Sequence, residues 1–271
     1  THGFLTMRFN DDDGGGHIRI QGSTGSGGQS LNLMSTNKYM DSQWYHMVLR
    51  VEMGNSNANK VRLYVNGELV TYYSSAAFND SALSSNFWQG TNSRITLNAF
   101  TDGSQQGDHH YAEFYFVDGQ DLVASTFAET DSNGTWRAKA SDTVKATINS
   151  GSNTFGANGC YLSFQDATSN TTLGYDYQTS DRSGTTNDFT AVNASSMFGI
   201  LGSPDNDFAI MNEQARDYTG WDFDNGGLKI TTNDTGTLQT ENFASKAIPK
   251  TGKWWYEVKM LELTTTGSGG T

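Results

Sequence analysis

Cysteine and proline are almost absent from this 271-residue sequence. Cys160 is the single cysteine, and there are only two prolines. One thiol can form no disulfide within the chain and cannot build a cysteine-rich zinc site. Cys160 lies in the apolar segment 159–164, which favours a buried core residue over a reactive thiol. The scarcity of cysteine therefore excludes a disulfide-stabilised scaffold.

Positive charge and long apolar runs are also scarce. The chain has 17 Lys and Arg against 29 Asp and Glu, for a formal net charge of −12. No run of Lys or Arg is present, so we expect no nucleic-acid partner, because an acidic surface repels phosphate. No stretch approaches the roughly 20 apolar residues of a membrane span, and the first residues do not resemble a signal peptide. We therefore expect no membrane span.

Glycine and aromatic residues are plentiful. The sequence has 30 Gly, 15 Phe, 12 Tyr and 6 Trp, with only 17% charged residues. Many Thr, Ser, Asn and Gly with few helix-forming Glu, Lys and Ala are typical of an all-β protein with polar loops. The aromatic content is large enough for a buried core and argues against disorder.

Period-two hydrophobic patterns separated by turn signals predict an antiparallel β-sandwich or jelly roll in residues 1–125. The strongest pattern is a hairpin in which Asn66-Gly67 joins strands 61–65 and 68–72, because Asn-Gly suits a type I′ turn. Residues 44–51 are apolar on nearly both faces, which predicts a central strand. The remaining predicted strands are 5–9, 17–20, 95–99 and 112–117.

The amino-acid composition of the sequence changes near residue 126. Residues 126–225 carry short aromatic islands between Ser, Thr, Asn and Gly stretches, which predicts an extended connector with little core of its own. Residues 226–271 begin a second β domain, with strands expected at 227–230 and 252–260. The chain starts at Thr1 without an initiator Met, and its end at residues 264–271 looks equally arbitrary. We therefore interpret the sequence as a fragment or processed product.

Several motifs follow one another in a distinctive order. A Trp-x-His strand at residues 44–48 is followed by a Tyr-Val-Asn-Gly hairpin within 61–68 and by the strand and turn of 112–120. This order resembles the C-terminal part of a laminin-G-like, concanavalin A-type jelly roll. We interpret the N-terminal strands of such a jelly roll, which are expected before the Asp- and Gly-rich hairpin, as missing from this sequence.

The later segments extend the resemblance. Residues 127–136, 155–164 and 203–209 follow in an order similar to large virion proteins of bacteriophages, often marine, in which a connector joins a laminin-G-like domain to a SPRY-like domain. Residues 253–258, Lys-Trp-Trp-Tyr-Glu-Val, look like the opening strand of that SPRY-like domain. We interpret this SPRY-like domain as truncated at residue 271.

The resemblance implies a non-enzymatic structural or adhesion protein on the surface of a virion, as a tail fibre, tail appendage or capsid decoration. It also implies assembly with copies of itself or with other virion proteins, as a trimer or other symmetric oligomer. Host-surface glycans are the expected ligands. The alternative is a carbohydrate-binding module of a secreted bacterial protein.

Two groups of side chains are candidate metal ligands. Asp11 and Asp13 can supply oxygen ligands to Ca²⁺, but three consecutive aspartates cannot all face one ion, so a solvated turn is favoured. The Asp108-His109-His110 run with Glu113 suggests a transition metal, yet adjacent strand residues point to opposite faces. We therefore assign no metal and expect no cofactor, with Ca²⁺ as the open alternative.

The sequence carries no marked catalytic constellation. The Gly-x-Ser-x-Gly elbow is absent, and five histidines with no placed nucleophile give no triad. The acidic residues always offer pairs for glycosidase chemistry, but no motif surrounds any of them. We expect that the protein is not an enzyme, and we interpret His46 as a partly buried structural residue.

Aromatic side chains are the candidate binding residues. Trp88, Tyr72 and Tyr111 can stack on a sugar ring, although an aromatic residue in a virion-type sandwich is more often core or subunit interface. Four aromatics of the predicted connector are candidates for an interface between chains, because Tyr and Trp suit such surfaces. They are Trp136, Phe155, Tyr161 and Phe164.

Overall fold

The computed structural model describes residues 4–10, 16–23, 31–39, 44–52, 54, 59–76, 95–97, 110–164, 166, 169–179, 181–183, 187–192, 211, 221–224, 229–232 and 257–259. The chain divides into two compact units. The first unit contains Thr1–Met40 and Trp44–Ser195, and the second contains Asp41–Gln43 and Ser196–Thr271.

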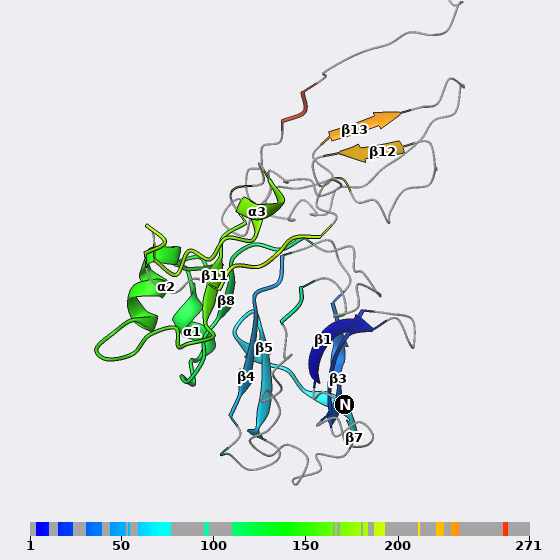
Figure 1. Ribbon diagram of the computed structural model, residues 1–271. Helices are drawn as coiled ribbons and strands as arrows, with labels where there is room; N and C mark the ends of the chain where they lie inside the picture. The colour runs from blue at the N-terminus through cyan, green and yellow to red at the C-terminus, as the bar shows by residue number, and fades with distance from the viewer. Residues whose placement is uncertain are drawn as a thin grey trace, which may run out of the picture. The chain divides into compact units, whose positions relative to one another are not determined.

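Two antiparallel sheets form the sandwich of the first unit (Figure 1). The four-stranded sheet has the order β1-β2-β3-β7, with β1 at Phe4–Asn10, β2 at His17–Ser23, β3 at Leu31–Lys38 and β7 at Tyr72–Ala76. The three-stranded sheet has the order β4-β5-β6, with β4 at Met47–Val51, β5 at Val61–Val65 and β6 at Glu68–Leu69. The predicted all-β antiparallel fold is therefore confirmed.

The core of the sandwich lies between these two sheets. Each sheet contributes alternate residues to one buried cluster, as expected for strands with one inward face. On β5 the burial alternates along the strand, with Val61, Leu63 and Val65 inside. The other buried members are Ile18, Ile20, Leu31, Leu33 and Val70.

The predicted hairpin is present, with a shorter second strand than expected. Asn66 and Gly67 both have positive φ, at 50° and 85°, which is the backbone of a type I′ turn. Strand β6 ends at Leu69 because Val70 turns into the core. Tyr72 then begins β7 in the opposite sheet. The chain therefore crosses between sheets within the segment predicted to be a single strand.

Strand β4 stands at one end of its sheet as far as the structure describes it, whereas the sequence predicted a central strand. All five of its residues are half-buried. Met47, Leu49 and Val51 pack against the sandwich core, and Arg50 contacts Asp121 from the following segment. The apolar character on both faces thus reflects cover from that segment rather than a second neighbouring strand.

We call residues 110–192 the accessory module. Its elements are strands β8 (Phe114–Phe116), β9 (Ala128–Thr130), β10 (Trp136–Ala138) and β11 (Cys160–Leu162), and helices α1 (Ala124–Phe127), α2 (Ser141–Ile148) and α3 (Asn170–Leu173). Strand β8 pairs with β11, and β9 pairs with β10. The strand predicted at 112–117 therefore exists but pairs outside the sandwich.

The accessory module has a buried cluster of its own, which the sequence did not predict. Val144 and Ile148 on α2 are fully buried against Phe155 and Tyr161. Their i, i+4 spacing places both on one face of the helix. Tyr115 and Tyr161 stack with ring centroids 4.5 Å apart. The segment predicted as an extended connector is thus folded where residues 126–192 are described.

The second unit contains the hairpin of β12 (Trp221–Asp224) and β13 (Lys229–Thr232). The strand predicted at 227–230 begins at Lys229, and β12 was missed. Residues 95–97 and 257–259, expected within strands, are not in strand conformation. The domain boundaries proposed at residues 125 and 225 stay predictions.

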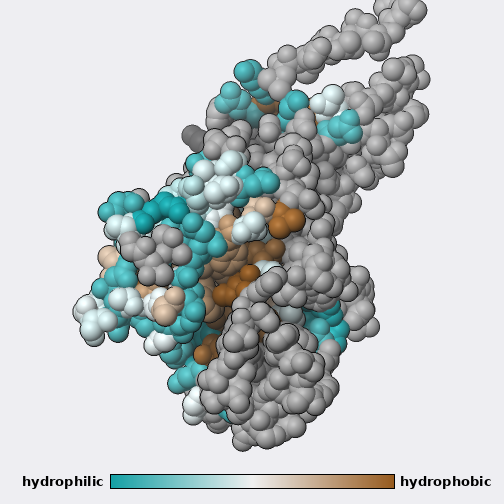
Figure 2. Space-filling view, in the orientation of Figure 1, coloured by the Kyte–Doolittle hydropathy of each residue, from teal (hydrophilic) through white to brown (hydrophobic). Residues whose placement is uncertain are grey.

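The face of the molecule shown in Figure 2 carries both hydrophobic and hydrophilic residues. In Figure 2 the hydrophobic residues on the visible face gather near its centre, and the outer surface of the accessory module is mostly hydrophilic. Within the described ranges, no helix has both the length and the apolarity to cross a membrane.

Candidate functional site

The Asn66-Gly67 turn is held by a residue far along the chain. A Cβ atom at Gly67 would lie 2.9 Å from the ring of Trp136 on β10, so the indole packs directly on the turn. Trp136 Nε1 also donates a hydrogen bond to His46 Nδ1 at 3.1 Å. Because an indole N–H only donates, Nδ1 of His46 carries a lone pair and its neutral ring holds the proton on Nε2.

The backbone of His46 is also hydrogen-bonded to the Asn66-Gly67 turn. Its backbone N–H donates to Asn66 Oδ1 at 2.9 Å, and its carbonyl accepts from the Asn66 N–H at 2.8 Å. The ring of Phe127 lies 6.5 Å from the imidazole. Burial lowers the pKa of His46 and favours the neutral form that the Trp136 bond requires.

A second contact joins the outer face of β4 and β5 to the accessory module. Arg50 donates from Nε to Asp121 Oδ1 at 2.7 Å and from Nη2 to Oδ2, a bidentate pair. Arg62 Nη2 lies 2.9 Å from Glu52 Oε2 and 3.7 Å from Asp121 Oδ2. Hydrogen bonds from Arg50 hold the pKa of the Asp121 carboxyl below its usual range. The sandwich and the module are thus connected at two separate places.

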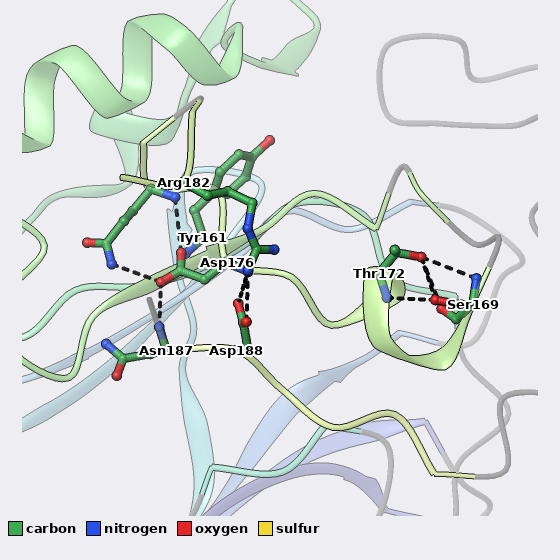
Figure 3. A network of polar contacts seen from close by, with 8 residues as sticks. Tyr161, Ser169, Thr172, Asp176, Arg182, Asn187 and Asp188 are labelled. Atoms are coloured by element: carbon green, nitrogen blue, oxygen red, sulfur yellow. Dashed lines mark hydrogen bonds and ion pairs between the residues drawn. The ribbon is translucent and has the colours of Figure 1, made fainter. Parts of the chain in front are cut away.

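Asp176 is the centre of a buried polar network in the accessory module (Figure 3). Its Oδ1 accepts from the backbone N–H groups of Tyr161 at 2.9 Å and Gln178 at 3.0 Å. Its Oδ2 accepts from Gln178 Nε2 at 2.8 Å and the Asn187 N–H at 2.9 Å. These four bonds fill the acceptor capacity of a carboxylate. The Asp176 carboxylate therefore links β11 by hydrogen bonds to the segment that follows α3.

Asp188 lies beside this network and is only partly satisfied. Its Oδ1 accepts from the Asp176 N–H at 2.9 Å and from Arg182 Nη2 at 3.2 Å, and its Oδ2 accepts from the same nitrogen at 2.8 Å. The Arg182 guanidinium lies 3.4 Å from the centroid of the Tyr175 ring, a cation–π contact. One acceptor position of Asp188 is left by these three bonds.

A small cavity adjoins Asp188 in the accessory module. Its volume is about 160 Å³. Two aromatic rings and several short polar side chains line it. These residues are Tyr175, Phe189, Asn170, Thr171, Asp188 and Thr190.

The backbone around the cavity is tightly fixed. The Phe189 N–H donates to the Gly174 carbonyl at 2.8 Å, and a Cβ atom at Gly174 would lie 1.9 Å from the Phe189 carbonyl oxygen. Helix α3 begins with a capping box in which Ser169 and Thr172 exchange hydrogen bonds (Figure 3). Glycine at position 174 is therefore required by the close approach of these two segments.

The sandwich resembles a known family. Residues 1–106 match the family described as the concanavalin A-like lectin/glucanases superfamily. We call these residues the concanavalin A-like domain, after the family that they resemble. The match covers β1 to β7 and ends before the accessory module begins. No curated protein and no solved structure matches the chain.

The structure describes two of the three predicted carbohydrate-binding residues. Tyr72 packs against the core of the concanavalin A-like domain, and burial raises its pKa to about 12. Tyr111 precedes β8 in the accessory module and is 41% exposed. Trp88 lies outside the described residues. Of the three, Tyr111 is the described ring with accessible surface for a ligand.

The predicted metal candidates are only partly described. Asp11, Asp13, Asp108 and His109 lie outside the described residues. Glu113 accepts hydrogen bonds from the hydroxyls of Tyr115 and Tyr161, each at 3.3 Å. Within the described part of the chain, no group of three or more His, Cys, Asp or Glu side chains is placed to hold a metal ion.

The four predicted interface residues have different environments. Phe155 and Tyr161 are buried inside the chain itself, so their burial needs no partner chain. Trp136 packs on the hairpin of the concanavalin A-like domain. Phe164 is half-buried with a φ of 53°. Their role in contacts between chains stays a prediction.

Cys160 is buried, as predicted. Burial, together with the charge of Asp176, raises its thiol pKa to about 12. A thiol with so high a pKa is protonated at neutral pH and is a weak nucleophile. Cys160 therefore serves as a core residue of β11.

Sequence reasoning missed Asp176, Arg182 and Asp188. Each is a single polar residue in a Ser-, Thr- and Asn-rich stretch, with no motif around it. The one local signal was Tyr175-Asp-Tyr177, an acidic residue between two aromatic rings.

Proposed function

We propose that the chain is a non-enzymatic adhesion protein that presents its β modules on the surface of a virion and binds host-surface glycans. The observation that carries the proposal is the concanavalin A-like domain clamped to a folded accessory module by Trp136 and Asp121. The superfamily is named for lectins and glucanases, and both kinds of protein recognise carbohydrate, which supports a role in carbohydrate binding or adhesion.

Two carboxylates of the described residues, Asp176 and Asp121, have structural rather than catalytic surroundings. A general acid or base needs a titratable group within reach of substrate and with a pKa near the working pH. Asp176 is fully buried and saturated with hydrogen bonds. Asp121 is paired with Arg50, which lowers its pKa. Both carboxylates have structural partners instead.

The virion role rests on the order of segments along the chain. A laminin-G-like domain, an aromatic and polar intermediate segment and a SPRY-like opening strand resemble the arrangement of phage structural proteins. A tail fibre, tail appendage or capsid decoration is the expected location. The net charge of −12 suits an exposed, repeated surface that must remain soluble.

The second candidate is a carbohydrate-binding module of a secreted bacterial protein, and the same family match favours it. The two candidates share the ligand class and differ in assembly. The virion role predicts a trimer or other symmetric oligomer, whereas a binding module works as a single chain.

A glycan array with the intact chain tests the proposal. We expect binding to a subset of host-surface glycans, measured with and without Ca²⁺, and no shortening of those glycans after prolonged incubation. Release of shorter saccharides would contradict the non-enzymatic role. Failure to bind any glycan would contradict the adhesive role.

A further inference from the structure

We propose that the cavity bordered by Asp188, Tyr175 and Phe189 binds one ring of a neutral saccharide, so that the accessory module has a glycan site of its own. The inference deepens the proposed adhesive function and rests on it. The cavity lies in residues 170–191, outside the matched concanavalin A-like domain.

The size of the cavity suits a single ring. Pockets for drug-sized ligands usually measure about 300–1,000 Å³. A cavity of about 150 Å³ holds a six-membered ring the size of benzene. The volume here is about 160 Å³. It therefore suits the ring of one pyranose, such as the terminal residue of a glycan, with the outer hydroxyl groups left in solvent.

The lining combines apolar faces with hydrogen-bonding groups, as a sugar ring does. Tyr175 and Phe189 offer aromatic surface for the C–H face of a pyranose. Asn170, Thr171 and Thr190 carry exposed amide and hydroxyl groups, which have no hydrogen-bond partner among the described residues. These groups can exchange hydrogen bonds with sugar hydroxyls.

Asp188 gives the cavity a fixed hydrogen-bond acceptor whose negative charge is offset by Arg182. Arg182 and the Asp176 N–H hold its carboxylate in place, and one acceptor position is left for a ligand hydroxyl. The Arg182 charge offsets that of Asp188, and the rest of the lining is uncharged. The site therefore favours a neutral saccharide over a cation or an anionic sugar.

The walls of the cavity are preorganised. The capping box of α3, the Gly174–Phe189 hydrogen bond and the stacking of Arg182 on Tyr175 all fix the lining through contacts within the chain. A preformed site loses less conformational entropy on binding, which raises affinity.

Two variants and the unaltered chain are tested against an array of immobilised neutral and acidic glycans. Asn170→Ala/Thr190→Ala removes two polar contacts and should weaken binding about tenfold. Thr190→Trp fills the cavity and should abolish binding. Ser150→Trp, an equally bulky change at an exposed residue just after α2, is the matched control and should bind as the unaltered chain does.

The outcomes separate this inference from the proposed function. If the unaltered chain binds glycans and both cavity variants bind equally well, the cavity assignment fails and the adhesive function stands. If the unaltered chain binds no glycan, both fail. If only sialylated or other acidic glycans bind, the neutral class is wrong. Thermal unfolding of each variant shows whether it is folded, and the double alanine variant carries the test if Thr190→Trp is not.

Discussion

Gly67 lies where the hairpin turn meets Trp136, and its φ of +85° already disfavours any side chain. The Gly67→Ala variant should lose about 2–3 kcal/mol of unfolding free energy, from backbone strain and from displacement of the indole. Chemical denaturation with tryptophan fluorescence measures the loss.

Gly134 is the matched control for this prediction. Its φ is +81°, yet a Cβ atom there would meet nothing within 4 Å. Gly134→Ala should therefore cost only the backbone strain, about 1 kcal/mol. Equal losses in the two variants would show that Trp136 does not pack on the turn.

His46 makes stability depend on pH. Its pKa is lowered in the folded protein, so below the unfolded-state pKa of about 6.5 the unfolded chain binds a proton more readily. The stabilisation is complete above that pH and is lost as the pH falls through the folded-state pKa. Protonation of Nδ1 also removes the acceptor for Trp136.

Unfolding free energies at about pH 7.5 and pH 5 test this prediction. The decrease on acidification should be smaller in His46→Gln, which cannot titrate. An identical pH dependence in both proteins would mean that other groups cause it.

At the scale of elements, α2 supplies the core of the accessory module. Val144→Ala removes two buried methyl groups and should lower the unfolding free energy by about 2 kcal/mol. Val192→Ala is the matched control, because Val192 is 75% exposed. It should change stability by less than about 0.5 kcal/mol. Equal effects of the two changes in a denaturation series would contradict the packing of α2.

The elements that were predictable from sequence have local signals. Asn66-Gly67 determines its turn through backbone preference, and alternating Val61, Leu63 and Val65 determine the inward face of β5. Helix α2 was missed because its apolar face has only Val144 and Ile148 among polar neighbours. Its stability comes from tertiary contacts with Phe155 and Tyr161, which a local pattern does not contain.

The candidate site was even less predictable. Asp188, Tyr175 and Asn170 approach one another only after the chain folds back at Gly174. The Trp136–His46 bond joins residues 90 positions apart. Such contacts depend on how the accessory module packs against the sandwich, which no local pattern contains. The burial of Cys160, in contrast, was predictable from its apolar neighbours in the sequence.

At the scale of the whole molecule, the account predicts assembly. Phe155 and Tyr161 are already buried within one chain, so exposed residues must provide any interface. Light scattering of the intact chain should give a trimer or another symmetric oligomer. A monodisperse folded monomer would contradict the virion role and favour the secreted binding module.

The structure of the intact chain with a bound host glycan tests the central claim most directly. We predict an uncleaved glycan whose terminal neutral ring lies between Tyr175 and Phe189, with a hydroxyl on Asp188. A glycan bound only to the concanavalin A-like domain would contradict the accessory site. A cleaved glycan, or no bound glycan at a saturating concentration, would contradict the role in adhesion without catalysis.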